Sequence, residues 1–208
     1  MALLHKATLT PSKLELLTGH LATRVWFEDS DHAELSMLGS YRFDDPAGEV
    51  GIETHLLGFG SGPMIQVPLT YRAAPVAGAD DRMISTMEHS ALGTRWVYDA
   101  CGDPVYVAEL VRAILTGGTQ VEQYFETDEG RIVRDPTATV IGSGSPGTPV
   151  PAIDTVASRF DGANTLIHAG GLEIVVRHLL TDLPTAPGSS LSGTWADAPR
   201  PVTLAFCR

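Results

Sequence analysis

The stretch "MEHSALGTRWVYDACGDPVY" (residues 87–106) gathers side-chain types that acid–base chemistry and ligand binding use. It holds an acid beside an imidazole, and it is preceded by a guanidinium in "VPLTYR" (residues 67–72). If such groups meet in one pocket on the polar face of a sheet, they can bind or transform a small molecule. The candidate ligand-binding or interface residues are Arg72, Glu88, His89, Arg95 and Asp99.

The expected strand geometry argues against a joint acid–base role for the adjacent pair Glu88 and His89. Neighbouring residues on a strand point to opposite faces, so these two side chains cannot form a hydrogen-bonded acid and base. Asp103 is explained by a structural role, since it precedes Pro104 at the start of a clear helix. We therefore predict no catalytic residue in this stretch, and the question of enzymatic activity stays open.

Other motifs that resemble sites have simpler structural explanations. The seven histidines lack the spacing of a zinc site, so no metal is predicted. The glycines of "GFGSGP" (58–63) precede a strand-like run rather than a helix, which favours a hairpin turn over a phosphate loop. "GSGSPG" (142–147) lacks the strand-to-helix turn of a serine nucleophile and is interpreted as a linker. No cofactor is predicted.

The pattern of apolar residues predicts one helix, then strands, then a second helix. Thr10 and Pro11 are expected to open a helix over "PSKLELLTGHLATR" (11–24). Period-two runs predict strands in "LSMLGSYRF", "VGIETHLLGF", "MIQVPLTYR", "MISTMEH" and "GTRWVYDA". In "MIQVPLTYR" the alternation predicts a dry face and a wet face that carries Gln66, Thr70 and Arg72. Asp103 as cap and Gly117-Gly118 as stop delimit the second helix.

The C-terminal part is rich in Gly, Ser, Thr and Pro, with short strand-like runs. Strands are expected in "ATVIGS", "NTLIHAG", "LEIVVRHLL" and "PVTLAFC", with a hairpin at Ala169-Gly170-Gly171. "DPTATVIGSGSPGTPVPAIDT" (135–155) and "LPTAPGSSLSGTWADAP" (183–199) are expected to be loops or short edge pieces. The predicted organisation is an α+β region over residues 1–118 and a β-rich extension over 119–208 that completes the same domain.

Composition excludes several classes of partner. The formal net charge of −11 repels phosphate backbones and anionic lipids, so neither nucleic acid nor a membrane surface is an expected partner. His5 and Lys6 interrupt the apolar start of the chain, which argues against a secretory signal. Cys101 and Cys207 are expected to be buried, reduced thiols. These features favour a cytoplasmic location.

Three stretches together resemble the N-terminal cap domain of actinobacterial maltokinases. They are "LTPSKLELLTGHLATRVWF", "VGIETHLLGFGSGPMIQVPLTYRAAPVAG" and "EHSALGTRWVYDACGDPVYVAELVRAI". The most specific pieces are "VPLTYR" (67–72), "LGTRWVYDA" (92–100) and "DPVYVAELV" (103–111). The resemblance implies a cystatin-like cap, in which a helix lies across a curved antiparallel sheet. In that family the cap precedes a two-lobed kinase that phosphorylates maltose with ATP.

The kinase itself is missing from the sequence. The stretch that begins at His168, "HAGGLEIVV", has neither the catalytic-loop aspartate nor the following asparagine of such a phosphotransferase. Similar proteins are often labelled 1,4-alpha-glucan branching proteins, yet branching needs a (β/α)8 barrel with paired carboxylates. The resemblance implies a context in trehalose, maltose and α-glucan metabolism.

Two functions from different classes follow as hypotheses. The first is a non-catalytic cap-like protein that acts through an interface or a modest ligand site, with a sugar kinase or α-glucan enzyme as partner. The second is a sugar or sugar-phosphate binding protein, or an uncharacterised enzyme, that uses the polar face of the sheet. A second copy of the chain could also cover unpaired sheet edges, so a homodimer is a further hypothesis.

Overall fold

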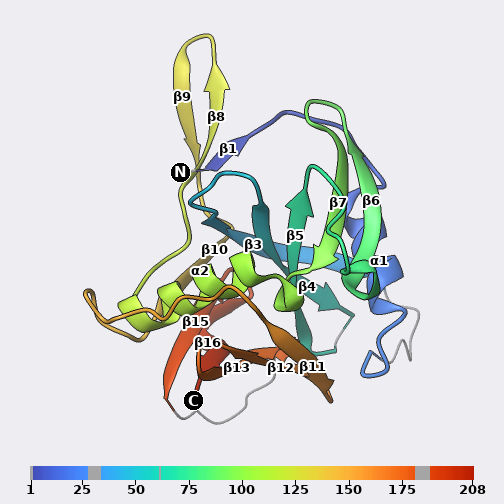
Figure 1. Cartoon of the computed structure of the whole chain (residues 1–208). Coiled ribbons are helices and arrows are strands. Elements are labelled where there is room, and N and C mark those ends of the chain that lie inside the picture. The colour runs from blue at the N-terminus through green and yellow to red at the C-terminus, as the bar shows by residue number, and fades with distance from the viewer. Residues whose placement is uncertain (1, 28–33, 61, 181–187) are drawn as a thin grey trace.

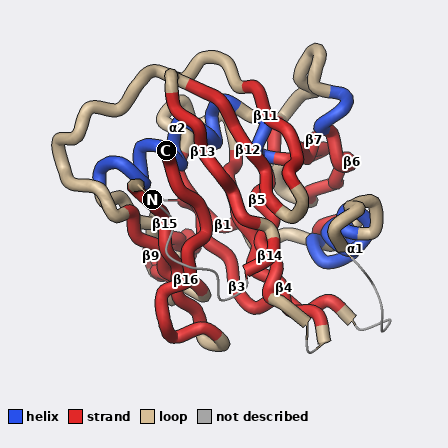
Figure 2. The backbone as a smooth tube through the Cα atoms, turned by 90° about the horizontal axis from the view of Figure 1, so that it is seen from below, coloured by secondary structure: helices blue, strands red, loops and turns tan. Residues whose placement is uncertain are grey.

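A computed structural model describes residues 2–27, 34–60, 62–180 and 188–208. It is an α+β fold with curved, mainly antiparallel sheets and a helix across one of them, as the sequence predicted (Figures 1 and 2). No helix in the described part of the chain has the length and apolar character needed to cross a membrane.

The central sheet contains the five strands expected between residues 35 and 100. Its order is β2-β6-β7-β5-β4-β3, with β14 paired to β5, and all its pairs are antiparallel. The strands are β2 (Leu9–Thr10), β3 (Leu35–Asp44), β4 (Gly51–Phe59), β5 (Met64–Arg72), β6 (Met83–His89), β7 (Gly93–Asp99) and β14 (Leu179–Leu180).

Helix α1 (Lys13–Leu21) packs across one face of this sheet. Its buried residues Leu16, Leu17 and Leu21 join a core that includes Ile65 and Val67 from β5. The expected start of this helix was wrong by two residues. Ser12 is the cap, with a reciprocal capping box to Glu15. Thr10 instead extends β2 and pairs with Glu88.

The opposite face of the central sheet is also covered, which corrects the prediction of a wet face on β5. Gln66 and Thr70 are 1% and 0% exposed. Gln66 accepts a hydrogen bond from the Tyr41 hydroxyl and donates to the carbonyl oxygens of Arg177 and Leu204. Polar residues alternate here because they meet buried partners from distant segments, rather than water.

A second, six-stranded sheet provides those partners. Its order is β10-β15-β16-β13-β12-β11. The strands are β10 (Ala138–Gly142), β11 (Ala157–Asp161), β12 (Asn164–Ala169), β13 (Leu172–Arg177), β15 (Ser189–Trp195) and β16 (Ala198–Cys207). The hairpin between β12 and β13 is confirmed, with positive φ at Gly170 and Gly171. All four expected strand runs lie on strands of the structure.

The stretch "LPTAPGSSLSGTWADAP" was wrongly expected to form loops or edge pieces. It contains β15, which lies between β10 and β16 in the interior of the sheet and buries Leu191 and Trp195. Residues 183–187 of the stretch lie outside the described residues.

Helix α2 (Pro104–Thr116) is confirmed with its predicted cap and stop. The Asp103 carboxylate accepts from the Val105 amide, and Gly117 ends the helix at φ 72°. The helix contacts β3 of the central sheet and β10, β15 and β16 of the second sheet. One core therefore contains residues such as Tyr41, Leu110 and Leu204 from both halves of the chain. The division at residues 118/119 stays a prediction.

A small third sheet projects from this body (Figure 1). β8 (Gln123–Thr127) and β9 (Gly130–Arg134) form a hairpin, and β1 (Ala2–Leu4) pairs with β8 in parallel. Two 3-10 turns, Asp80–Arg82 and Ala100–Gly102, precede β6 and α2. Residues 5–8 connect β1 to β2 and thus form an N-terminal strap between the hairpin and the central sheet.

Candidate functional site

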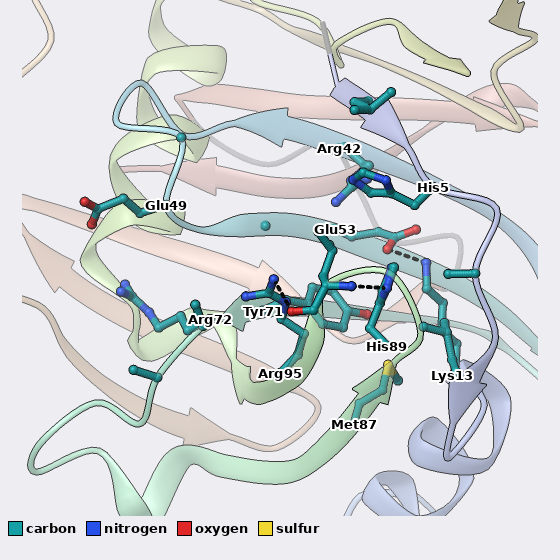
Figure 3. A pocket seen from close by; sticks show the side chains of 18 of the residues that line it. His5, Lys13, Arg42, Glu49, Glu53, Tyr71, Arg72, Met87, His89 and Arg95 are labelled. Atoms are coloured by element: carbon teal, nitrogen blue, oxygen red, sulfur yellow. Dashed lines mark hydrogen bonds and ion pairs between the residues drawn. The ribbon is translucent and has the colours of Figure 1, made fainter. Parts of the chain in front are cut away.

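The main cleft has a volume of about 830 Å³ and lies on the α1 side of the central sheet (Figure 3). Its lining comes from the N-terminal strap, the start of α1, strands β3 to β7 and the loop that follows β5. The volume falls within the range of small-molecule sites.

An ionised carboxylate lies in the floor of the cleft. Glu53 of β4 is 5% exposed, and its Oε2 accepts a hydrogen bond from Lys13 Nζ at 2.6 Å. Burial favours the neutral acid, but the positive charges of His55 when its ring is protonated, and of Lys13 and Arg42, outweigh it and lower the pKa of Glu53. The cleft thus contains a charged acid whose partner comes from α1.

His55 and Tyr71 form a buried polar pair beside this carboxylate. His55 Nε2 lies 3.0 Å from the Tyr71 hydroxyl and 3.8 Å from Glu53 Oε2. Burial lowers the pKa of His55 to about 4, so the ring is neutral at pH 7. Burial and the Glu53 charge raise the pKa of Tyr71. These groups are suited to hydrogen bonding rather than to proton transfer near neutral pH.

Cationic and imidazole groups line the rim of the cleft. In Figure 3, Arg42 and His5 lie together, and Arg95 and His89 lie across from them. The rings of His5 and His89 meet edge to face with centroids 5.9 Å apart. Burial, His5 and Arg95 lower the pKa of His89, which therefore has a neutral ring at pH 7.

The structure brings three of the five candidate residues to this cleft. Arg72, His89 and Arg95 are among its lining residues, and Glu88 and Asp99 are not. The Glu88 carboxylate instead accepts from the Thr94 hydroxyl on the neighbouring strand. Ligand binding by Arg72, His89 and Arg95 stays a prediction.

Asp99 and Arg72 have structural partners. Asp99 caps the turn at Cys101 and lies 3.6 Å from Arg24 beyond the end of α1. Arg72 makes two hydrogen bonds to the Asp103 carboxylate, at 2.9 and 2.8 Å, and so links β5 to the start of α2. Arg95 and His89 are therefore the candidates with the most freedom to contact a ligand.

Sequence reasoning missed several residues of the cleft. His5, Lys13, Arg42 and Glu53 come from four separate elements, and no local spacing links them. One signal was present in "GIETHLLGF", where Glu53 and His55 occupy alternate positions of an otherwise apolar strand. Polar residues on a strand that packs on both faces need buried partners, which marks them as part of a network.

A second polar cluster lies beyond the other end of α1. His178 is buried, bonds to Thr165 and the Gln66 carbonyl, and stacks on Trp26 at 5.4 Å. The Arg24 guanidinium lies 4.6 Å above the Phe160 ring. Within the described ranges, no three His, Cys, Asp or Glu side chains gather closely enough to hold a metal ion. This cluster has a structural explanation in the packing of Arg24 and Trp26, which follow α1, against Phe160 and His178.

Comparison with known proteins gives one family. No curated protein matches the chain. The model of the maltokinase N-terminal cap domain matches residues 20–103, a segment that runs from the last turn of α1 through β7 to the cap of α2. The resemblance found in the sequence is thus confirmed over residues 20–103, the cap segment, which is similar to maltokinase N-terminal cap domains.

Proposed function

We propose that this is a non-catalytic, cap-like protein of actinobacterial trehalose, maltose or α-glucan metabolism, which works in the cytoplasm by binding a small sugar-type ligand. The observation that carries the proposal is the cleft of about 830 Å³ formed largely by the cap segment. Its lining mixes apolar wall residues with converging polar groups, which is the usual character of a small-molecule site.

The character of the C-terminal half supports a non-catalytic role. Residues 119–208 hold strands β8 to β16 in the described part, whereas the kinase C-lobe implied by the resemblance is mainly helical. Strands β10, β12, β13, β14, β15 and β16 share a core with the cap segment. We propose that they complete one domain with it.

Binding to the full chain tests the proposal directly. Thermal-shift screening followed by calorimetry against maltose, trehalose, glucosamine, the phosphates of these sugars and nucleotides should find at least one sugar-type ligand. Ala7→Trp, which fills the cleft from the N-terminal strap, should abolish that binding. Ala157→Trp, on the exposed edge strand β11, is the matched control and should leave it unchanged. No response to any sugar or sugar derivative would contradict the proposal.

A second candidate function is docking onto a sugar kinase or α-glucan enzyme. The observation that favours it is the family match, because the resemblance places such a cap in front of a kinase. A purified candidate kinase mixed with the full chain should co-elute in size-exclusion chromatography. If every candidate enzyme elutes separately, and the chain elutes alone as a monomer or homodimer, docking is contradicted.

A further inference from the structure

We infer that the cleft recognises its ligand through a phosphate-type anionic group held between Arg42 and Arg95, beside His5 and His89. The ligand class is therefore a sugar phosphate rather than a neutral sugar. This inference deepens the proposed function and rests on it.

The balance of charge in the cleft is opposite to that of the whole chain. The protein has 25 acidic and 14 basic residues, yet the cleft is lined by four basic side chains and two acidic ones. The basic residues come from α1, β3, β5 and β7, so no cationic run in the sequence reveals them. A positive site on an acidic protein attracts a small anion and disfavours large polyanions.

Two of the four cations are neutralised inside the protein. Lys13 pairs with Glu53, and Arg72 is held by Asp103. Arg42 and Arg95 form no ion pair with any carboxylate among the described residues. Their two positive charges remain available to a ligand, while the Glu49 carboxylate points away from them in Figure 3.

The hydrogen-bond donors of Arg95 and His89 are directed by their local contacts. The Arg95 guanidinium donates one hydrogen bond to the Leu92 carbonyl oxygen at 2.8 Å. Its other N–H donors can bind a ligand. His89 Nδ1 accepts from the amides of Ala91 and Leu92 at 3.2 Å. Because Nδ1 is an acceptor, the proton of the neutral ring must be on Nε2, which becomes a donor for an anion.

This set of donors fits phosphate oxygens. Planar guanidinium groups bind phosphate through paired N–H donors, and charge-assisted bonds of this kind are about twice as strong as neutral ones. A phosphate monoester has close to two negative charges at pH 7, which matches the two arginines that form no ion pair among the described residues. A sugar attached to that phosphate has room in a cleft of about 830 Å³.

Calorimetry on the full chain tests the inference with three probes: a hexose 6-phosphate, the same hexose, and inorganic phosphate. The hexose phosphate should bind at least about tenfold more tightly than the hexose, and inorganic phosphate should compete with it. Arg42→Gln and Arg95→Gln should each weaken hexose-phosphate binding by about tenfold or more. Arg200→Gln removes an exposed arginine outside the cleft and should change nothing.

Further variants and outcomes separate recognition from folding. The ligand-free melting temperature of each variant shows that it is folded, and Arg95→Lys should keep part of the affinity because the charge remains. Equal affinity for the hexose and its phosphate, with Arg95→Gln unchanged, overturns this inference and leaves the proposed function standing. If neither sugar nor sugar phosphate binds, the proposed function fails as well.

Discussion

Lys13 Nζ lies 2.6 Å from Glu53 Oε2, so the first residue of α1 is joined to the first half of strand β4. The carboxylate side chain is 7% exposed and the lysine 35%, so the pair is closed on the protein side and open on the cleft side. This contact fixes both the helix on the sheet and the floor of the cleft.

Lys13→Met should lower the free energy of unfolding at pH 7 by about 2 kcal/mol, because the buried Glu53 charge loses its partner. Urea denaturation measures the loss. The double variant Lys13→Met with Glu53→Gln should recover much of it, because the uncompensated charge is gone. Lys6→Met, at an exposed position, should be neutral. Additive effects in the cycle would contradict an energetic coupling.

The pH dependence of the free energy of unfolding should reflect the lowered pKa of the buried His55. Its folded-state pKa is about 4, below the ordinary value of 6.5, because burial disfavours the charged ring. Below pH 6.5 the unfolded chain therefore binds a proton that the folded chain does not, and stability falls between about pH 6.5 and 4. The full contribution is about 3 kcal/mol. His55→Gln should flatten this fall in urea titrations at pH 7, 6 and 5, and parallel curves for the two proteins would contradict the assignment.

Gln66 should be a key residue between the two sheets. Gln66→Leu removes three buried hydrogen bonds, two to carbonyl oxygens and one from the Tyr41 hydroxyl, so the free energy of unfolding should fall by about 3 kcal/mol. Chemical denaturation followed by circular dichroism gives the value. A chain ending at residue 118 should lack a cooperative transition, since it loses the second sheet. A stable, cooperatively folding 1–118 fragment would contradict the single-domain proposal.

Two glycines should respond in opposite ways to alanine. A Cβ on Gly142 would lie 1.8 Å from the Ala113 carbonyl oxygen in α2, so Gly142→Ala should destabilise by about 3 kcal/mol. Gly19, on the exposed side of α1, has open space where a Cβ would project, with no atom within 4 Å. Gly19→Ala should stabilise by about 0.5–1 kcal/mol through helix propensity. Melting temperatures of the two variants should move apart, and equal shifts would contradict this view of the α2–β10 contact.

The strands and helices with strong local signals were predictable. The period-two runs of β3 to β7 and the Asp103 cap of α2 specify structure within a few residues. β15 was missed because its Ser and Gly content is typical of loops, while its pairing with both β10 and β16 buries Leu191 and Trp195. Tertiary pairing outweighed local propensity at that strand.

The candidate site was only partly predictable for a related reason. The alternation of polar residues on β5 predicted a face exposed to water. Gln66 on that face is instead buried, and two of its hydrogen-bond partners lie 111 and 138 residues further along the chain. The cleft likewise depends on Lys13 and Glu53 meeting across 40 residues. The residue types were enough to select Arg95 and His89 as candidate ligand-binding residues. They could not show that Asp99 lies outside the cleft, beside Arg24 after the C-terminal end of α1.

The N-terminal strap gives the cleft a wall that reports on its occupancy. Residues 5–8 are anchored at one end by β1 on β8 and at the other by β2 on β6, with the Thr8 amide bonded to the Ser90 hydroxyl. A bound molecule that contacts this wall also restrains it. Deuterium uptake by peptides that contain residues 5–8 should therefore slow on ligand addition, which gives a signal of occupancy without a modified ligand.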